Sequence, residues 1–205
     1  ERLDVGQSRD ADGDGGVATA VKQVIIRLLR VYSFQQDADC GFGVWKGADD
    51  CQIVWDQPST LFPKGSGSYG GEVNSVIWID YDPADLIGTD QSQALLRFTN
   101  IFGTGPGQIP PGAKIVSAEL IMNLTDSGHG ALFNRMLLDW DAEGTTYSSI
   151  AGGDSIHLDD VEAISGTNSF LMDMANNTTS GTGLRQIGVT ADIQAWLDGA
   201  ANYGW

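Results

Sequence analysis

The chain has 205 residues, enough to bury a substantial core in one domain. Lys and Arg number 11 against 27 Asp and Glu, so the net charge is −16, and like-charge repulsion disfavours nucleic acids and anionic membranes as partners. No run approaches the roughly 18 apolar residues of a membrane span, so we expect no membrane insertion. The acids are 22 Asp and only five Glu, a balance typical of turns and calcium loops rather than helix faces.

Residues 1–30 are predicted to be an N-terminal extension whose first half is an acidic loop. Asp10, Asp12 and Asp14, followed by Gly15, match the first six positions of a calcium loop, where alternate carboxylates converge on one ion. Val21 stands at the twelfth position, which in an EF-hand requires a bidentate acid, so a full EF-hand is excluded. A partial calcium site and a solvated acidic linker both remain open.

The apolar segment that follows, residues 17–34, fits two kinds of secondary structure. Its apolar residues mark one face of a helix, and in its second half they also mark one face of a strand. Val and Ile dominate this second half, which favours a strand.

Two cysteines, Cys40 and Cys51, lie close together in a polar, glycine-rich stretch. They can close a small disulfide loop, which would indicate an oxidising compartment, or remain free thiols in a cytosolic loop. Trp45 lies in the same stretch, and we expect it to be the most exposed of the six Trp residues. An exposed indole there could stack on a sugar ring.

From residue 35 onward, short apolar runs separated by Gly, Pro, Asp and Ser clusters predict an all-β sandwich. The clearest strand is 114–124, where Val116, Ala118, Leu120, Met122 and Leu124 alternate with polar residues. Further strands are predicted at 72–80, 93–98 and 131–140, with loops at 101–112 and 124–130.

One short helix is predicted near the end of the chain. Thr190 can cap it, Asp192 lies in its first turn, and Gly199 can terminate it. Trp196 on this helix is expected in the core.

The acidic cluster Asp80, Asp82, Asp85 and Asp90 follows a predicted strand. Such a loop can bind calcium, and it can equally be turn chemistry that aids solubility.

Catalysis has little support in the sequence. Asp139, Asp141 and Glu143 could supply paired carboxylates for glycoside hydrolysis, but a structural turn explains them more simply. His129 lies in a glycine-flanked loop, and neither a nucleophile elbow nor a phosphate-binding loop occurs. We therefore expect no enzyme activity.

Several motifs occur in a fixed order: a strand ending in Arg97-Phe98, a Pro-Pro-Gly turn feeding a Ser-Ala-x-Leu strand, a Trp-Asp-x-Glu segment, and a closing helix followed by Asn-Tyr-Gly-Trp. In this order residues 31–205 resemble the DNRLRE-type module of secreted bacterial and archaeal proteins, which is similar to certain carbohydrate-binding modules. The resemblance implies a jelly-roll-like antiparallel β-sandwich, secretion, and a non-catalytic role. With this secreted character, we predict a disulfide between Cys40 and Cys51.

Two functions follow as expectations. The first is an extracellular or cell-surface module that binds polysaccharide, with Trp45 as glycan contact and calcium at the two Asp clusters. The second is a structural subunit that binds copies of itself in a filament or matrix. The family pattern continues past Asn-Tyr-Gly-Trp into a strand that this sequence lacks, so an open sheet edge could accept residues 21–34 of another copy.

Overall fold

The computed structural model describes residues 29–63, 92–124, 131–153, 156–165, 170–172 and 183–205. The chain divides into two compact units, Glu1–Val31 and Tyr32–Trp205. Of the first unit only residues 29–31 are described, and Leu29 and Val31 are exposed there. The predicted strand at 72–80 lies outside the described residues.

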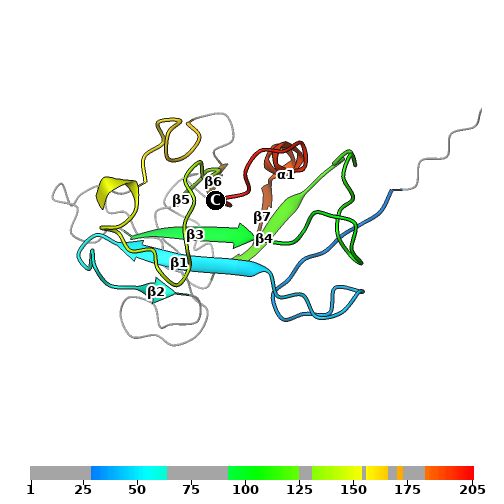
Figure 1. Ribbon diagram of the computed structural model, residues 1–205, viewed down its shortest axis with the longest axis horizontal. Coiled ribbons are helices and arrows are strands. Elements are labelled where there is room, and N and C mark those ends of the chain that lie inside the picture. Colours follow the sequence, from blue (N-terminus) through cyan, green and yellow to red (C-terminus); the bar gives the residue numbers. More distant parts are fainter. Residues whose placement is uncertain (1–28, 64–91, 125–130, 154–155, 166–169, 173–182) are drawn as a thin grey trace, which may run out of the picture. The chain divides into compact units, whose positions relative to one another are not determined.

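The second unit consists mostly of antiparallel strands with one short C-terminal α-helix, as the sequence predicts (Figure 1). The described residues form three small sheets, with the strand orders β2-β1-β3, β4-β7 and β5-β6. The elements are β1 Ala48–Val54, β2 Phe62–Pro63, β3 Ser92–Phe98, β4 Glu119–Leu124, β5 Ala131–Phe133, the 3₁₀ turn η1 Ala151–Gly153, β6 Phe170–Met172, β7 Gly183–Gly188 and α1 Thr190–Leu197.

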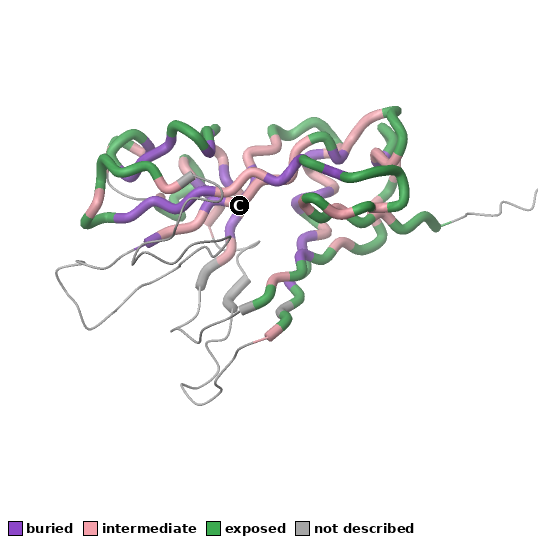
Figure 2. The backbone as a smooth tube through the Cα atoms, turned by 90° about the horizontal axis from the view of Figure 1, so that it is seen from below, coloured by how far each residue is buried: buried purple, intermediate pink, exposed green. Residues whose placement is uncertain are grey.

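The sheet of β1 and β3 is covered on both faces. In its register Ala48 lies opposite Phe98; Ala48 belongs to one buried cluster, the first cluster, and Phe98 packs against it. Cys51 lies opposite Leu95, and these two belong to a second buried cluster together with Ile53. Because neighbouring residues of a strand point to opposite faces, the two clusters lie on opposite sides of this sheet. Five of the seven residues of β1 are accordingly buried and none is exposed, and Figure 2 shows buried backbone in continuous stretches.

The last two residues of the chain extend this sheet. Trp205 and Leu96 exchange two backbone hydrogen bonds, each 2.8 Å long, which is the pattern of an antiparallel pair. On the other side, the Met136 N–H donates to the Gly204 carbonyl at 2.8 Å, and Met136 bridges onward to Ala163. The C-terminal residues therefore join β3 to the segment around Met136.

Helix α1 has a start that differs from the prediction. Val189 is the N-cap, without a side-chain capping bond, and Thr190 is the first helical residue. The Thr190 hydroxyl oxygen instead accepts a hydrogen bond from the Ala118 N–H at 2.9 Å. The predicted cap thus fastens the helix to the residue preceding β4.

The end of α1 is formed by Gly199, as predicted. Its N–H donates to the Trp196 carbonyl, and the Ala200 N–H donates to the Ala195 carbonyl. This pair of bonds is a Schellman motif, and it requires the left-handed conformation that Gly199 adopts with φ +108°. Trp196 is buried, as expected.

Strand β4 is shorter than predicted. It starts at Glu119 rather than at residue 114, and Val116 is exposed. The reason lies in α1, because the Ile115 N–H donates to the Gln194 side chain at 2.8 Å and the Ala118 N–H donates to Thr190. Before residue 119, these two side chains therefore accept the backbone hydrogen bonds that a neighbouring strand would otherwise accept.

The predicted strand 131–140 is also shortened, to β5 at Ala131–Phe133. The residues after β5 form an isolated bridge at Met136 and backbone bonds with the 162–164 segment rather than a long strand. The described end of the ambiguous segment, residues 29–34, belongs to neither a helix nor a strand.

We predict that Gly204→Ala destabilises the protein more than Gly199→Ala does. Both glycines have positive φ, so either Ala should cost about 1 kcal/mol of backbone strain. At Gly204 the added methyl group would also collide with the Leu96 carbonyl and lie 2.8 Å from the Arg97 Cα, adding roughly 1–3 kcal/mol. At Gly199 it would meet nothing within 4 Å. Urea unfolding measures the free energy of unfolding of both variants. Equal losses of stability would contradict the close approach of Gly204 to the β3 backbone.

Candidate functional site

Trp45 is buried, which corrects the expectation of an exposed indole. Its ring lies 5.6 Å from the Phe98 ring in a stacked arrangement, and the Phe34 ring meets it edge-on at 5.6 Å. Only 8% of the residue is exposed. Although glycines lie on both sides of Trp45, its ring is not exposed to solvent, because the loop that contains it folds over the first cluster. Trp45 therefore cannot offer its face to a glycan.

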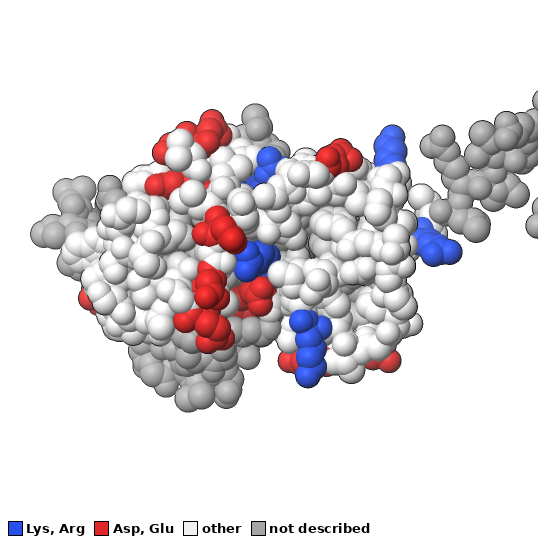
Figure 3. Space-filling view, viewed as in Figure 1, with Lys and Arg blue, Asp and Glu red and all other residues white. Residues whose placement is uncertain are grey.

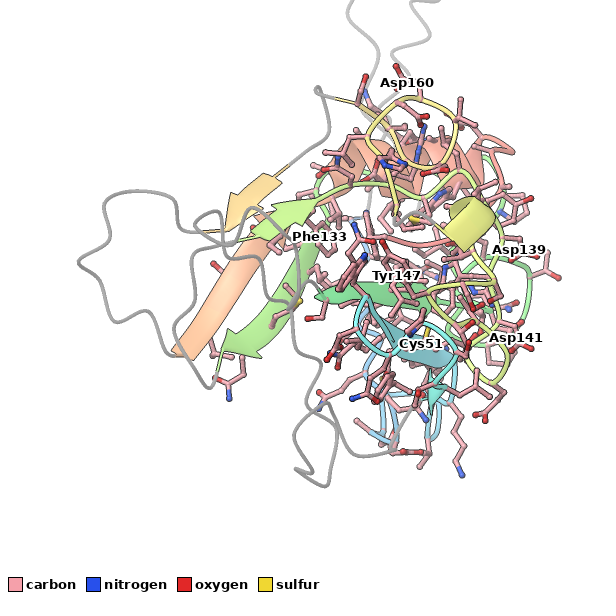
Figure 4. The ribbon with its side chains drawn as sticks, turned by 90° about the vertical axis from the view of Figure 1, so that its left-hand side faces the viewer. Cys51, Phe133, Asp139, Asp141, Tyr147 and Asp160 are labelled. Carbon is pink, nitrogen blue, oxygen red and sulfur yellow. The ribbon has the colours of Figure 1, made fainter. Side chains whose placement is uncertain are left out.

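Cys40 and Cys51 are free thiols in this structure, which shows no disulfide between them. Cys51 lies on β1 and belongs to the second cluster (Figure 4). Cys40 is half-buried and packs against the first cluster instead. The chain spacing between them is short, but Cys51 on β1 and Cys40 in the preceding loop pack in different clusters.

Arg97 of β3 is the centre of a polar group that the sequence analysis did not single out as a site. Its guanidinium lies 2.8 Å from an Asp139 carboxylate oxygen and 3.6 Å from Asp49, the residue opposite it on β1. It also lies 4.8 Å from the centre of the Trp140 ring. On the face shown in Figure 3, acidic side chains gather around one basic side chain near the middle. These contacts fasten the 139–140 segment to β3.

The acids after Trp140 form a turn. One Asp141 carboxylate oxygen accepts a hydrogen bond from the Glu143 N–H at 3.1 Å, and the Thr145 N–H donates to the Asp141 carbonyl at 2.8 Å. Asp139 and Asp141 both lie toward the same side in Figure 4. With Asp139 engaged by Arg97 and Asp141 closing the turn, this arrangement fits the structural interpretation of the Asp139, Asp141 and Glu143 motif.

A buried carboxylate holds the C-terminal Trp in place. The Trp205 indole N–H donates to Asp192 at 2.8 Å, and the Arg135 side chain lies 3.9 Å from the other Asp192 oxygen. Asp192 is 3% exposed. Its predicted place in the first helical turn is confirmed. The hydrogen bond between Asp192 and Trp205 could not be inferred from the sequence, because the rest of the helix and a loop separate the two residues.

The loop at 156–165 is held together by its own carboxylates. Asp159 accepts hydrogen bonds from the Val161 and Glu162 N–H groups, and these bonds lower the pKa of Asp159. Asp160 accepts from the Ser165 N–H and hydroxyl, which likewise lowers its pKa. These acids are occupied by turn formation.

Among the described aromatic residues, Trp55, directly after β1, has the largest exposed fraction, 39%. It lies in a turn closed by a hydrogen bond from the Gln57 N–H to the Val54 carbonyl at 3.2 Å. The same turn is anchored by the Ser148 N–H, which donates to the Pro58 carbonyl at 2.7 Å. The sequence analysis did not single out Trp55, because exposure depends on which loops cover the ends of β1.

The predicted calcium ligands Asp80, Asp82, Asp85 and Asp90 lie outside the described residues, as do Asp10, Asp12 and Asp14 and the loop residue His129. In the described part of the chain, His, Cys, Asp and Glu side chains form no group of three that could hold a metal ion. The described helices also include none that is long and apolar enough to cross a membrane.

Comparison with known proteins finds no match to a family model, to a curated protein or to a solved structure.

We predict that native Cys40 is alkylated while Cys51 is protected. Burial, aided by Asp50 and Asp141, raises the pKa of the Cys51 thiol from 9.0 to about 12, so at pH 8 only about one thiol in 10⁴ would be ionised. Mass spectrometry after mild alkylation should show one label, with a second after unfolding. Two native labels, or none before reduction, would contradict this arrangement.

The same shift predicts a loss of stability at high pH. A thiol whose pKa is higher in the folded state stabilises the protein fully below pH 9 and loses this contribution as the pH rises toward 12. Between pH 8 and pH 10.5 the free energy of unfolding should fall by about 2 kcal/mol through this group. Cys51→Ala is the control: its loss over the same interval should be smaller by that amount.

Proposed function

We propose that the chain is a non-catalytic extracellular module that binds polysaccharide and is stabilised by calcium. The fold proposed for it is a jelly-roll-like β-sandwich. Antiparallel strands with both faces of the central sheet buried support this architecture. The resemblance of residues 31–205 to the DNRLRE-type module supports the extracellular role.

The observation that carries the proposal is the exposed ring of Trp55 on its anchored turn. A ring held by a fixed backbone can stack on a sugar ring without first losing much conformational freedom. Trp55 takes the role that the sequence analysis gave to Trp45. A neutral glycan suits the net charge of −16, and an anionic one would need calcium to bridge the like charges.

The non-catalytic part of the proposal is supported by the engaged carboxylates. Glycoside hydrolysis needs two carboxyl groups free to transfer a proton and to activate water or attack the sugar. Asp139 is instead paired with Arg97, and Asp141 closes a turn.

We predict that Trp55→Ala weakens retention on an immobilised polysaccharide by about 10- to 100-fold while leaving the melting temperature nearly unchanged. Affinity electrophoresis against a panel of neutral and acidic polysaccharides measures it. Leu61→Ala, a change at another exposed apolar residue, is the matched control and should retain binding. Unchanged retention of the Trp55 variant, or turnover of a glycan that Glu143→Gln abolishes, would overturn the proposal.

We also predict that calcium raises the melting temperature through the two Asp clusters. Calcium at 100 times its Kd should add about 2.7 kcal/mol to the free energy of unfolding. Asn substitutions at Asp80 and Asp82, and separately at Asp10 and Asp12, identify which cluster is responsible. Asp198→Asn, at the end of α1, should keep the full calcium effect. If a chelator leaves the melting temperature unchanged, neither cluster binds calcium and both are solvated turns.

A further inference from the structure

The two-stranded sheet of β4 and β7 has one buried face and one exposed face (Figure 1). On the buried face, Leu120 and Ile187 lie opposite each other and belong to the first cluster. Because neighbouring residues of a strand point to opposite faces, the alternate positions form an outer face. All positions of this outer face are exposed: Glu119, Ile121 and Asn123 on β4, and Leu184, Gln186 and Gly188 on β7.

Asn123 on this outer face begins a glycosylation motif. Leu124 and Thr125 follow it, so the sequence fulfils the pattern Asn-x-Thr in which x is not Pro. Such a motif needs an accessible Asn side chain, and Asn123 is exposed. Two further motifs, at Asn176 and Asn177, lie outside the described residues. Within the described part of the chain, Asn123 alone begins such a motif.

The nearest neighbours of Asn123 on the outer face include two apolar side chains. Leu184 lies directly opposite Asn123 in the register of β4 and β7, and it is 70% exposed. Ile121 is two residues earlier on the same strand face, and it is 56% exposed. Cβ atoms are roughly 5 Å apart across such a pair and about 7 Å apart along the strand. A sugar ring attached to Asn123 could therefore reach both side chains.

We propose that Asn123 carries an N-linked oligosaccharide whose first sugar covers Leu184 and Ile121. The donor is an oligosaccharide carried on a lipid phosphate. A bond forms between C1 of the first sugar and Nδ2 of Asn123, the bond from C1 to the phosphate oxygen breaks, and the lipid phosphate leaves with the electron pair. One amide proton of Asn123 passes to solvent. The modification goes beyond polysaccharide binding, and it rests on the proposed extracellular role, because this motif is modified in secreted proteins.

The attachment point favours contact between the sugar and the apolar pair. A sugar ring has an apolar face of C–H groups, which can pack on Leu184, and hydroxyl groups that stay in water. Because the sugar is tethered through Asn123, this contact is intramolecular and needs no affinity for a free ligand. The glycan thus replaces exposed apolar surface, which favours unwanted association, with hydrated hydroxyl groups.

Peptide mass spectrometry of the full chain, produced in the organism that encodes it and recovered outside the cell, tests the proposal. Trypsin releases residues 115–135 as one peptide, and its fragments should carry an added oligosaccharide mass on Asn123. Asn123→Gln and Thr125→Ala should each abolish the added mass, whereas Thr125→Ser should keep it. Asn134 lies in the same peptide, begins no motif and is 7% exposed, so it should be unmodified.

Hydrophobic-interaction chromatography tests the contact with Leu184. Asn123→Gln should lengthen retention, because the apolar pair loses its cover. Leu184→Gln should then shorten retention more in the Asn123→Gln background than in the glycosylated chain. Val116→Gln, at an exposed apolar residue before β4, is the matched control and should shorten retention equally in both backgrounds.

An unmodified Asn123 in protein recovered outside the cell would overturn the proposal and leave the extracellular role intact. Protein found only in the cytoplasm would overturn the extracellular role and this modification with it. An added mass that persists in Thr125→Ala would also contradict the assignment, because the motif would then not direct the transfer. Equal effects of Leu184→Gln in both backgrounds would overturn the contact between the sugar and this side chain.

Discussion

The contacts of Trp205 hold together parts of the chain that are far apart in sequence. Its backbone pairs with Leu96 of β3, its indole N–H donates to Asp192 of α1, and its ring packs 4.7 Å from that of Trp196. The preceding residue, Gly204, accepts from Met136. Helix α1, strand β3 and the segment after β5 are therefore all held by the same two residues, and each would lose packing and hydrogen bonds without them.

This anchor works only because the neighbouring residues allow a close approach. Gly204 lies against the β3 backbone where no side chain fits. Asn202 donates to the Phe98 carbonyl at 2.7 Å, and the Trp140 indole donates to the Tyr203 carbonyl at 2.6 Å. The Asn-Tyr-Gly-Trp motif is thus a structural element of the core, in which each residue makes a different contact with β3 or with the segment that follows β5.

The sequence predicted local structure well and side-chain environment poorly. The hydrophobic pattern of β3 and the Gly199 stop of α1 depend on neighbouring residues, so they could be predicted. The start of β4 could not, because the N–H groups of Ile115 and Ala118 are bound by side chains more than 70 residues away. Trp45 was misjudged for a similar reason: its burial depends on Phe98, which no local pattern connects to it.

The free thiols on β1 and in the preceding loop bear on where the protein can fold. Both cysteines of the chain are unbonded, and the clusters around them consist of aliphatic and aromatic side chains. With both thiols free, no disulfide contributes to the fold described, so reductants such as glutathione should leave its stability unchanged. Formation of this arrangement would then need no oxidant.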